Sequence, residues 1–303
     1  PTLSNDGRLL VFSAAGSVWI RDLPDGEPRR VGPERQMNTM ASLSPDKRQI
    51  AFISFDYDIG GMRGAARLMV HDIASGRSRA LMDDDASYYF PAWSPDRTKL
   101  AVVRKQKDPA ATQLGWIDLH GNTFHPVADG RHYLAESEFN LAERGSYPRW
   151  IAWSADGNKL LFQSFAESNG ENLPVKLEEV SLDASARRVV AEGATDVYAI
   201  VPAPDLQHAV VIGWDQNAYL VPLRSTPAQP VRISLEMTDI QRISTTGALF
   251  PHWVDNSRFR YGWMQSVFEY RIGQIETSEV ARTELTLPRR QGRGLLAIRN
   301  ARL

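Results

Sequence analysis

The stretch Trp93-Ser94-Pro95-Asp96-Arg97, followed by the apolar residues 100–103, is the most informative part of this sequence because versions of it recur along the chain. The aspartates of successive copies are 40, 50, 60, 49 and 50 residues apart. A period of this size, with a strand-like apolar run in each unit, predicts a propeller or another repeat array. The copies are Ser4-Asn5-Asp6-Gly7, Ser44-Pro45-Asp46-Lys47, Ser94-Pro95-Asp96-Arg97, Ser154-Ala155-Asp156-Gly157, Ala203-Pro204-Asp205-Leu206 and Val254-Asp255-Asn256-Ser257.

The chemistry of the repeated tetrapeptide is that of a tight turn. The aspartate side chain accepts a hydrogen bond from the backbone two residues further on, proline fixes φ, and glycine supplies a positive φ. In three copies Lys47, Arg97 and Leu206 take the place of that glycine. We therefore expect the repeated aspartates to cap turns rather than to act as catalytic carboxylates: Asp6, Asp46, Asp96, Asp156 and Asp205.

Each repeat unit carries four strand-like segments. One lies before the tetrapeptide and one after it, and two more follow across a turn that contains glycine or alanine. We place the fourth strand at residues 230–233 in the fifth unit and at residues 283–287 in the sixth. Four strands in each of six units predict an all-β fold, a six-bladed β-propeller with four-stranded antiparallel blades.

Composition sets further bounds on this chain of 303 residues, of which 43% are hydrophobic and 23% charged. That balance is typical of a globular protein with a substantial core. A net charge of −1 gives no electrostatic reason to expect a nucleic-acid partner. No apolar stretch approaches the roughly 18 residues that a membrane span needs. The absence of cysteine excludes disulfides, thiolate catalysis and cysteine-bound metal.

A search for catalytic patterns leaves no candidate in these residues. There is no Gly-x-Ser-x-Gly elbow, no glycine-rich phosphate loop and no His-Glu-x-x-His pair. The histidines are scattered without the spacing of a metal site: His71, His120, His125, His132, His208 and His252. We therefore assign no catalytic residue, cofactor or metal ligand within this chain.

Two long insertions interrupt the repeat, at residues 56–66 and 130–149. Extra length is expected in loops, and loops on a rigid scaffold often carry recognition. Tyrosine and arginine are also enriched among interface anchors. The candidate interface or gating residues are Tyr57, Arg63, Tyr133 and Arg144, although the same loops could simply cover blade edges.

The acidic run Asp83-Asp84-Asp85 offers oxygen ligands of the kind that calcium prefers. It lacks the glycine and the ligand spacing of a calcium loop. A solvated loop between strands is therefore the preferred interpretation.

The end of the sequence departs from the repeat. Residues 288–294 are turn-rich and basic, as a linker is, and residues 295–303 begin a new apolar run. This run either closes the ring as a blade strand or is the first strand of a second domain. We favour the second interpretation and divide the chain into a propeller, 1–287, and a linker with a first strand, 288–303. Arg289, Arg290 and Arg293 would then lie at the domain junction, where arginine pairs well with carboxylates.

The repeats resemble the TolB-like propeller, also called the PD40 or WD40-like repeat, over residues 3–287. The tail, with Leu-Ala-Ile-Arg-Asn-Ala-Arg-Leu at residues 296–303, resembles the opening strand of the small sandwich that precedes the barrel of amidohydrolases. Exported bacterial amidohydrolases carry such a propeller upstream of the barrel. The resemblance implies a divalent metal, zinc by preference, in the domain that would follow, and a periplasmic or otherwise exported location.

Three functions remain open at this point. The chain is the non-catalytic propeller of a metal-dependent amidohydrolase, acting in docking and substrate access, and this is the preferred hypothesis. Alternatively it is a stand-alone periplasmic module that binds a peptide or an envelope protein. The third possibility is the gating propeller of a serine peptidase of the prolyl-oligopeptidase type. The repeat alone is specific for the fold and poor for function.

Overall fold

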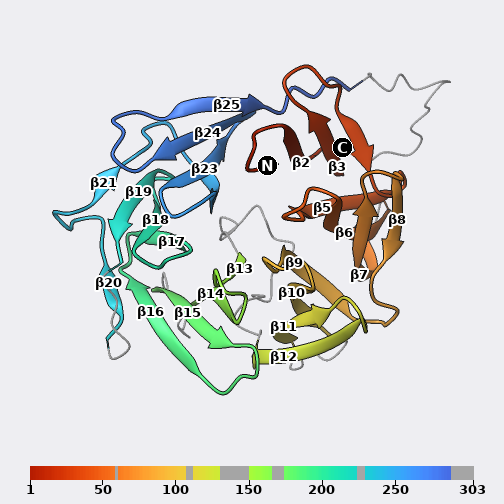
Figure 1. Ribbon diagram of the computed structural model, residues 1–303, viewed down its shortest axis with the longest axis horizontal. Helices are drawn as coiled ribbons and strands as arrows, with labels where there is room; N and C mark the ends of the chain where they lie inside the picture. The colour runs from red at the N-terminus through yellow and green to blue at the C-terminus, as the bar shows by residue number, and fades with distance from the viewer. Residues whose placement is uncertain (59–60, 107–111, 130–149, 166–173, 224–228, 288–303) are drawn as a thin grey trace, which may run out of the picture.

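The computed structural model describes residues 1–58, 61–106, 112–129, 150–165, 174–223 and 229–287. These residues form six sheets set in a ring around a common centre, without a helix among them (Figure 1). The predicted six-bladed β-propeller with four-stranded antiparallel blades is confirmed. We name the blades A to F in chain order.

Each blade is built from strands that are consecutive in the chain, with one exception described below. The strands of blades A to C are β1 (Thr2–Leu3), β2 (Leu9–Ala14), β3 (Ser17–Asp22) and β4 (Arg29–Val31); β5 (Gln36–Leu43), β6 (Gln49–Asp58), β7 (Gly61–Asp72) and β8 (Arg77–Ala80); and β9 (Ser87–Trp93), β10 (Lys99–Lys105), β11 (Thr112–Asp118) and β12 (Thr123–Asp129). Those of blades D to F are β13 (Ile151–Trp153), β14 (Lys159–Phe165), β15 (Val175–Ser181), β16 (Arg187–Gly193) and β20 (Val231–Ile233); β17 (Val197–Pro202), β18 (His208–Gly213), β19 (Ala218–Pro222) and β21 (Gln241–Arg242); and β22 (Leu249–Trp253), β23 (Arg258–Trp263), β24 (Ser266–Arg271) and β25 (Ser278–Arg282).

The second strand of each blade forms the centre of the packing. It pairs with a strand on either side, and both of its faces meet a neighbouring blade. Because both faces are covered, the strand is a continuous apolar run rather than an alternating one. Residues 100–103 of β10, for example, are fully buried, and so are residues 50–53 of β6. The apolar runs that follow the repeated turns are therefore the core of the ring.

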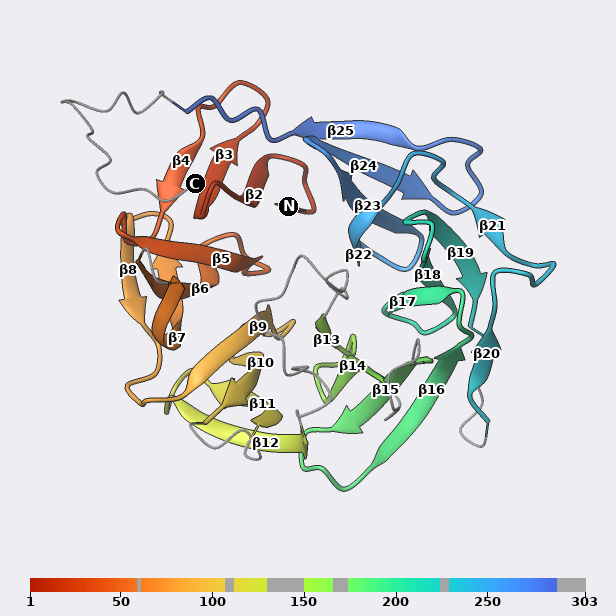
Figure 2. The ribbon, with the colours of Figure 1, turned by 180° about the vertical axis from the view of Figure 1, so that it is seen from behind.

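Blade E corrects one expectation. We placed its fourth strand at residues 230–233, but β20 pairs in parallel with β16 and is a fifth strand of blade D. Ala194 N donates to Ile233 O at 2.7 Å, and Leu235 N donates to Asp196 Oδ2, also at 2.7 Å. These two hydrogen bonds hold the end of β20 against the residues that follow β16. The true fourth strand of blade E is the short β21 (Figure 2).

Two further expectations were wrong in position. The fourth strand of blade F is β25, Ser278–Arg282, and residues 283–287 lie beyond it. The insertion at residues 56–66 is not a loop, because β6 and β7 continue through it as a hairpin whose backbone register pairs Tyr57 with Met62. The second insertion, residues 130–149, and the tail, residues 288–303, lie outside the described residues.

Candidate functional site at one end of the ring

The repeated turns are small hydrogen-bonded units. In blade C, Ser94 Oγ donates to Asp96 Oδ1 at 2.6 Å, and Thr98 N donates to the same oxygen at 3.0 Å. Lys99 N in turn donates to Ser94 Oγ at 2.9 Å. Because the Ser94 hydroxyl and the Thr98 amide stabilise the carboxylate, the pKa of Asp96 is well below its usual range. A carboxylate held ionised in this way suits a turn cap and not a general acid.

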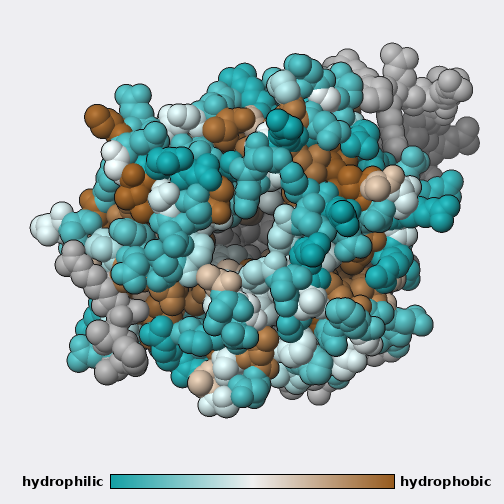
Figure 3. All heavy atoms as spheres, viewed as in Figure 1, coloured by the Kyte–Doolittle hydropathy of each residue, from teal (hydrophilic) through white to brown (hydrophobic). Residues whose placement is uncertain are grey.

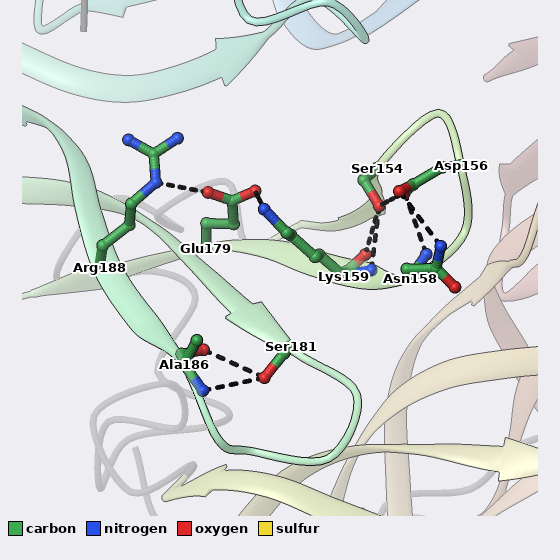
Figure 4. A network of polar contacts seen from close by, with 8 residues as sticks. All are labelled: Ser154, Asp156, Asn158, Lys159, Glu179, Ser181, Ala186 and Arg188. Carbon is green, nitrogen blue, oxygen red and sulfur yellow. Dashed lines mark hydrogen bonds and ion pairs between the residues drawn. The ribbon is translucent and has the colours of Figure 1, made fainter. Parts of the chain in front are cut away.

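The turn of blade D shows how such a unit joins the body of its blade. Ser154 Oγ donates to Asp156 Oδ1 at 2.6 Å, and Asn158 N donates to the same oxygen at 3.1 Å (Figure 4). On the adjoining strands, the buried Glu179 accepts from Lys159 Nζ at 2.8 Å and from Arg188 Nε at 2.6 Å. Burial alone would raise the pKa of Glu179, but these two cations outweigh it and lower the pKa. The described contacts of both carboxylates are internal to the blade.

Residues that replace the turn glycine link neighbouring blades. Lys47 and Arg97 adopt φ values of 61° and 64°, the left-handed region that glycine normally supplies. Lys47 Nζ contacts Asp6 Oδ2 of blade A at 2.6 Å, and Arg97 Nη1 contacts Asp46 Oδ2 of blade B at 2.6 Å. The hydrogen bond from Lys47, with that from Ser4, lowers the pKa of Asp6. Exposed ion pairs contribute little to stability, so the main effect of these two is to hold each turn beside the turn of the preceding blade.

The tryptophans that precede three of the turns also connect neighbouring blades, through hydrogen bonds inside the ring. Trp93 Nε1 donates to Ser42 O of blade B at 3.0 Å, and Trp153 Nε1 donates to Ala92 O of blade C at 3.0 Å. Trp253 Nε1 donates to a carbonyl of blade E, Val201 O, at 2.9 Å. Each indole thus contacts the blade that precedes its own.

The candidate interface residues are only partly placed. Tyr57 and Arg63 lie near the tip of the β6–β7 hairpin. Tyr133, Arg144, Arg289, Arg290 and Arg293 lie outside the described residues. In the acidic run, Asp84 Oδ2 accepts from Tyr88 Oη at 2.8 Å and from Arg104 Nη2 at 2.9 Å, so that carboxylate has internal partners.

The described histidines lie in four different blades. His71 Nδ1 is 2.9 Å from Ser78 Oγ, and the ring of His125 stacks on Trp116 at 4.1 Å. His120 is in a turn of blade C, while His208 and His252 belong to blades E and F. Over the described ranges, no group of three or more histidine, aspartate or glutamate side chains could hold a metal ion.

The first strands of three blades share a strained bulge that sequence reasoning missed. Met40, Phe90 and Phe250 have φ values of 53°, 55° and 53°, each at a shift of register between the first and second strand. A bulky side chain in this region costs on the order of 1–3 kcal/mol. Met40 and Phe90 pack against the largest core cluster, whereas Phe250 is 62% exposed. Each of these residues precedes the first residue of its turn motif by four, which is the signal that could have revealed them.

Phe250 belongs to a group of exposed apolar side chains at one end of blades E and F. Trp214, 38% exposed, follows β18 directly, and Met264, 90% exposed, follows β23 directly. Both lie in turns between the second and third strand of their blades. Ala248 N donates to Gln216 O at 2.7 Å, which places the start of β22 beside the turn of blade E. We call Trp214, Phe250 and Met264 the apolar rim.

The apolar rim offers a surface on which a partner could be bound. Figure 3 shows one face of the ring, hollowed at its centre, with apolar patches among a mainly hydrophilic surface. Large apolar side chains left in water at a strained position are typical of recognition sites. No helix in the described part of the chain is long and apolar enough to cross a membrane.

Comparisons with known proteins agree on the fold. No protein-family model matches the sequence, and no curated protein matches it either. Among solved structures, TolB from Acinetobacter baumannii is similar with a TM-score of 0.54 at 11% identity, over 86% of this chain and 59% of TolB. Oligogalacturonate lyase in complex with manganese is similar with a TM-score of 0.56 at 13% identity, over 93% of this chain and 76% of the lyase.

The two similarities differ in what they cover. This chain spans 59% of the length of the TolB chain, so TolB contains a substantial part that has no counterpart here. The manganese belongs to the lyase structure and is not attributed to this chain. At these identities the likeness is one of fold. The chain is a six-bladed β-propeller whose fold is similar to that of TolB.

Proposed function

We propose that this protein is a non-catalytic docking propeller and that a partner domain binds on the apolar rim. The observation that carries the proposal is Phe250, which is 62% exposed although its φ of 53° is unfavourable for a bulky residue. Folding alone gives no reason to keep an aromatic ring in water at a strained position. A partner that buries this ring would compensate the strain.

We further propose that the partner is a metal-dependent amidohydrolase domain of the same polypeptide, beside which the propeller limits substrate access. The resemblance of residues 288–303 supports this choice. So does the path of the chain, since Thr283 N donates to Gln265 O at 2.8 Å and Gln265 is next to Met264 of the rim. The divalent metal, zinc by preference, would belong to that domain, and an exported, periplasmic location goes with the proposal.

The docking step can be tested in the full-length polypeptide with a protease site introduced after Leu287. After cleavage we expect the two parts to remain associated during size-exclusion chromatography. Phe250→Asn should weaken this association at least tenfold without loss of stability, because asparagine tolerates a positive φ. Ile275→Asn is the matched control, since Ile275 is 94% exposed in the turn at the other end of blade F. Separation of the parts without any substitution would refute docking.

The catalytic assignment has its own test. We expect the full-length polypeptide to hydrolyse amides or dipeptides in a chelator-sensitive manner, and residues 1–303 to show no such activity with zinc, manganese or cobalt. Chelator-sensitive turnover by residues 1–303 alone would show that the propeller is itself an enzyme. A full-length polypeptide without bound metal would refute the amidohydrolase partner. The stand-alone module for a peptide or envelope protein, which would use the same rim, would then be preferred.

A further inference from the structure

The seam between blades F and A differs from the other five. Its apolar cluster has four buried members, Leu3, Leu10, Phe12 and Val267, whereas the other clusters of the described core have eight or more. Blade A has Leu3 where blades C, D and F have the tryptophan that donates to the preceding blade, and blades B and E have Leu43 and Pro202 there. The smallest apolar cluster and the lack of an indole link thus occur together at this seam.

Two arginine side chains connect blades F and A at this seam. Arg260 of blade F occupies the position that is equivalent, by strand pairing, to apolar residues of other blades: Ala51, Ala101, Leu161 and Val210. Its side chain is 4% exposed, and its Nη1 donates to Leu3 O at 3.0 Å and to Ser4 O at 2.8 Å of blade A. The charge is balanced by Glu269 Oε2 at 2.8 Å from Nε.

Arg21 makes the reciprocal contact from blade A to blade F. It pairs with Leu10, and the equivalent partners in blades C, D and E are the buried Ile117, Val180 and Val221. The Arg21 side chain is 12% exposed, and its Nη1 donates to Arg282 O at 3.2 Å and to Glu284 Oε2 at 3.0 Å.

Residues 283–287 cross this seam after the last blade strand. Thr283 is held on blade F by Gln265, Glu284 is bound by Arg21 of blade A, and Leu285 packs against the seam cluster. In both ribbon views the chain after β25 passes beside the β3–β4 hairpin of blade A (Figures 1 and 2). We call residues 283–287 the strap. An open surface groove of about 480 Å³ lies at this seam, lined by residues of both blades and of the strap, among them Arg8, Arg21, Val280 and Glu284.

We propose that the ring opens at the seam between blades F and A, and that the strap holds this seam shut. Among the described residues, every blade consists of its own consecutive strands apart from the added β20, so no described strand of blade A joins blade F to lock the ring. Local opening needs only the small cluster, the two arginine contacts and the strap to separate. The other seams would have to expose large apolar surfaces. Release of the strap thus opens a lateral path to the centre of the ring.

Hydrogen exchange in the full chain tests the proposal. The double substitution Glu284→Ala with Leu285→Ser removes both strap contacts. Ile275→Ser with Glu276→Ala is the matched control, because it also replaces one glutamate and one aliphatic residue, at exposed positions of blade F. We expect the strap variant to exchange the amides of β1, β2 and β25 at least tenfold faster, with blade C unchanged, and the control to match the parent protein.

Two results would overturn this inference. Equal protection of β1, β2 and β25 in the strap and control variants would mean that the strap does not hold the seam. An equal loss of protection in all six blades would mean that the ring unfolds as one unit. If the double variant does not fold, Arg21→Lys supplies the test. Lysine keeps the charge but loses the Nε and Nη2 donors to Gly26 O and Pro24 O, which hold Nη1 against Arg282 O and Glu284. It should raise exchange at the same strands by a smaller factor, and parent-like exchange there would also count against the strap.

Discussion

Replacement of Arg260 by alanine is the sharpest perturbation of the ring closure. The side chain is 4% exposed and serves three acceptors, Glu269 at 2.8 Å, Leu3 O at 3.0 Å and Ser4 O at 2.8 Å. Removing one partner of a fully buried ion pair costs about 3–5 kcal/mol. The cost is smaller here, because Glu269 is 21% exposed and keeps Arg258 Nη1 at 3.8 Å. Leu3 O loses this donor as well, at about 1–3 kcal/mol for a buried group left unsatisfied, whereas Ser4 O keeps the hydrogen bond from Gly7 N at 2.8 Å. Since part of this loss is recovered by water, we expect a total of about 4 kcal/mol.

The measurement is equilibrium unfolding in urea followed by tryptophan fluorescence. Arg271→Ala is the control, since Arg271 is exposed on the same blade and should change stability by less than about 0.5 kcal/mol. Arg260→Lys should fall between the two, because a single ammonium cannot span Glu269 and the blade A carbonyls together. If Arg260→Ala lowers the free energy of unfolding by no more than Arg271→Ala does, Arg260 does not hold blades F and A together.

Three further predictions follow from the turns and from a partly buried histidine. Asp156→Ala should cost about 1 kcal/mol in urea unfolding, as loss of a local cap does, and should leave the hydrolysis rate of a full-length enzyme near the parent value; a large loss of turnover with unchanged stability would make Asp156 a chemical residue. Gly157→Arg should create an ion pair with Asp96 like the one that Arg97 makes with Asp46. A double-mutant cycle with Asp96→Asn should measure a coupling energy of about 0.3–1 kcal/mol, and a coupling energy of zero would contradict the role of these ion pairs between neighbouring turns. Burial lowers the pKa of His252 to about 4, so as the pH falls from about 6.5 to 4 the unfolded chain takes up a proton that the folded protein refuses. Stability should decline by on the order of 3 kcal/mol over that range, and His252→Gln should remove this part of the pH slope.

The sequence predicted the fold because the signal is local and repeated. Each turn is built by residues a few positions apart, as Ser94 and Asp96 show, and the apolar run after it needs no distant information. The strand at residues 231–233 was placed in the wrong blade because its pattern is that of any edge strand. Its partner, β16, is selected by tertiary contacts such as those of Asp196. The true edge strand, Gln241–Arg242, is too short and too polar to be recognised.

The candidate site was much less accessible from the sequence. Phe250 is an ordinary apolar residue in a predicted strand, and only its backbone conformation and exposure set it apart. A bulge depends on the register of two strands, which a single sequence does not encode locally. The positions of Arg21 and Arg260 could be noticed only after the blades were aligned by their hydrogen-bond registers. Charges at core positions of blades A and F are the signal that a closer comparison of the repeats would have given.

The contacts of the repeated turns and tryptophans have a direction, and this bears on how such a chain can grow. Trp93, Trp153 and Trp253 each donate to the blade before their own, as Lys47 and Arg97 do at the surface. An interface of this head-to-tail kind can be repeated without a new complementary surface, and it ends only where rotation brings the last copy back to the first. Tandem duplication of one unit therefore preserves every donor and acceptor of its neighbours, whereas exchanging two units would separate them. In this protein Arg21 and Arg260 mark the seam at which the first and last copies meet.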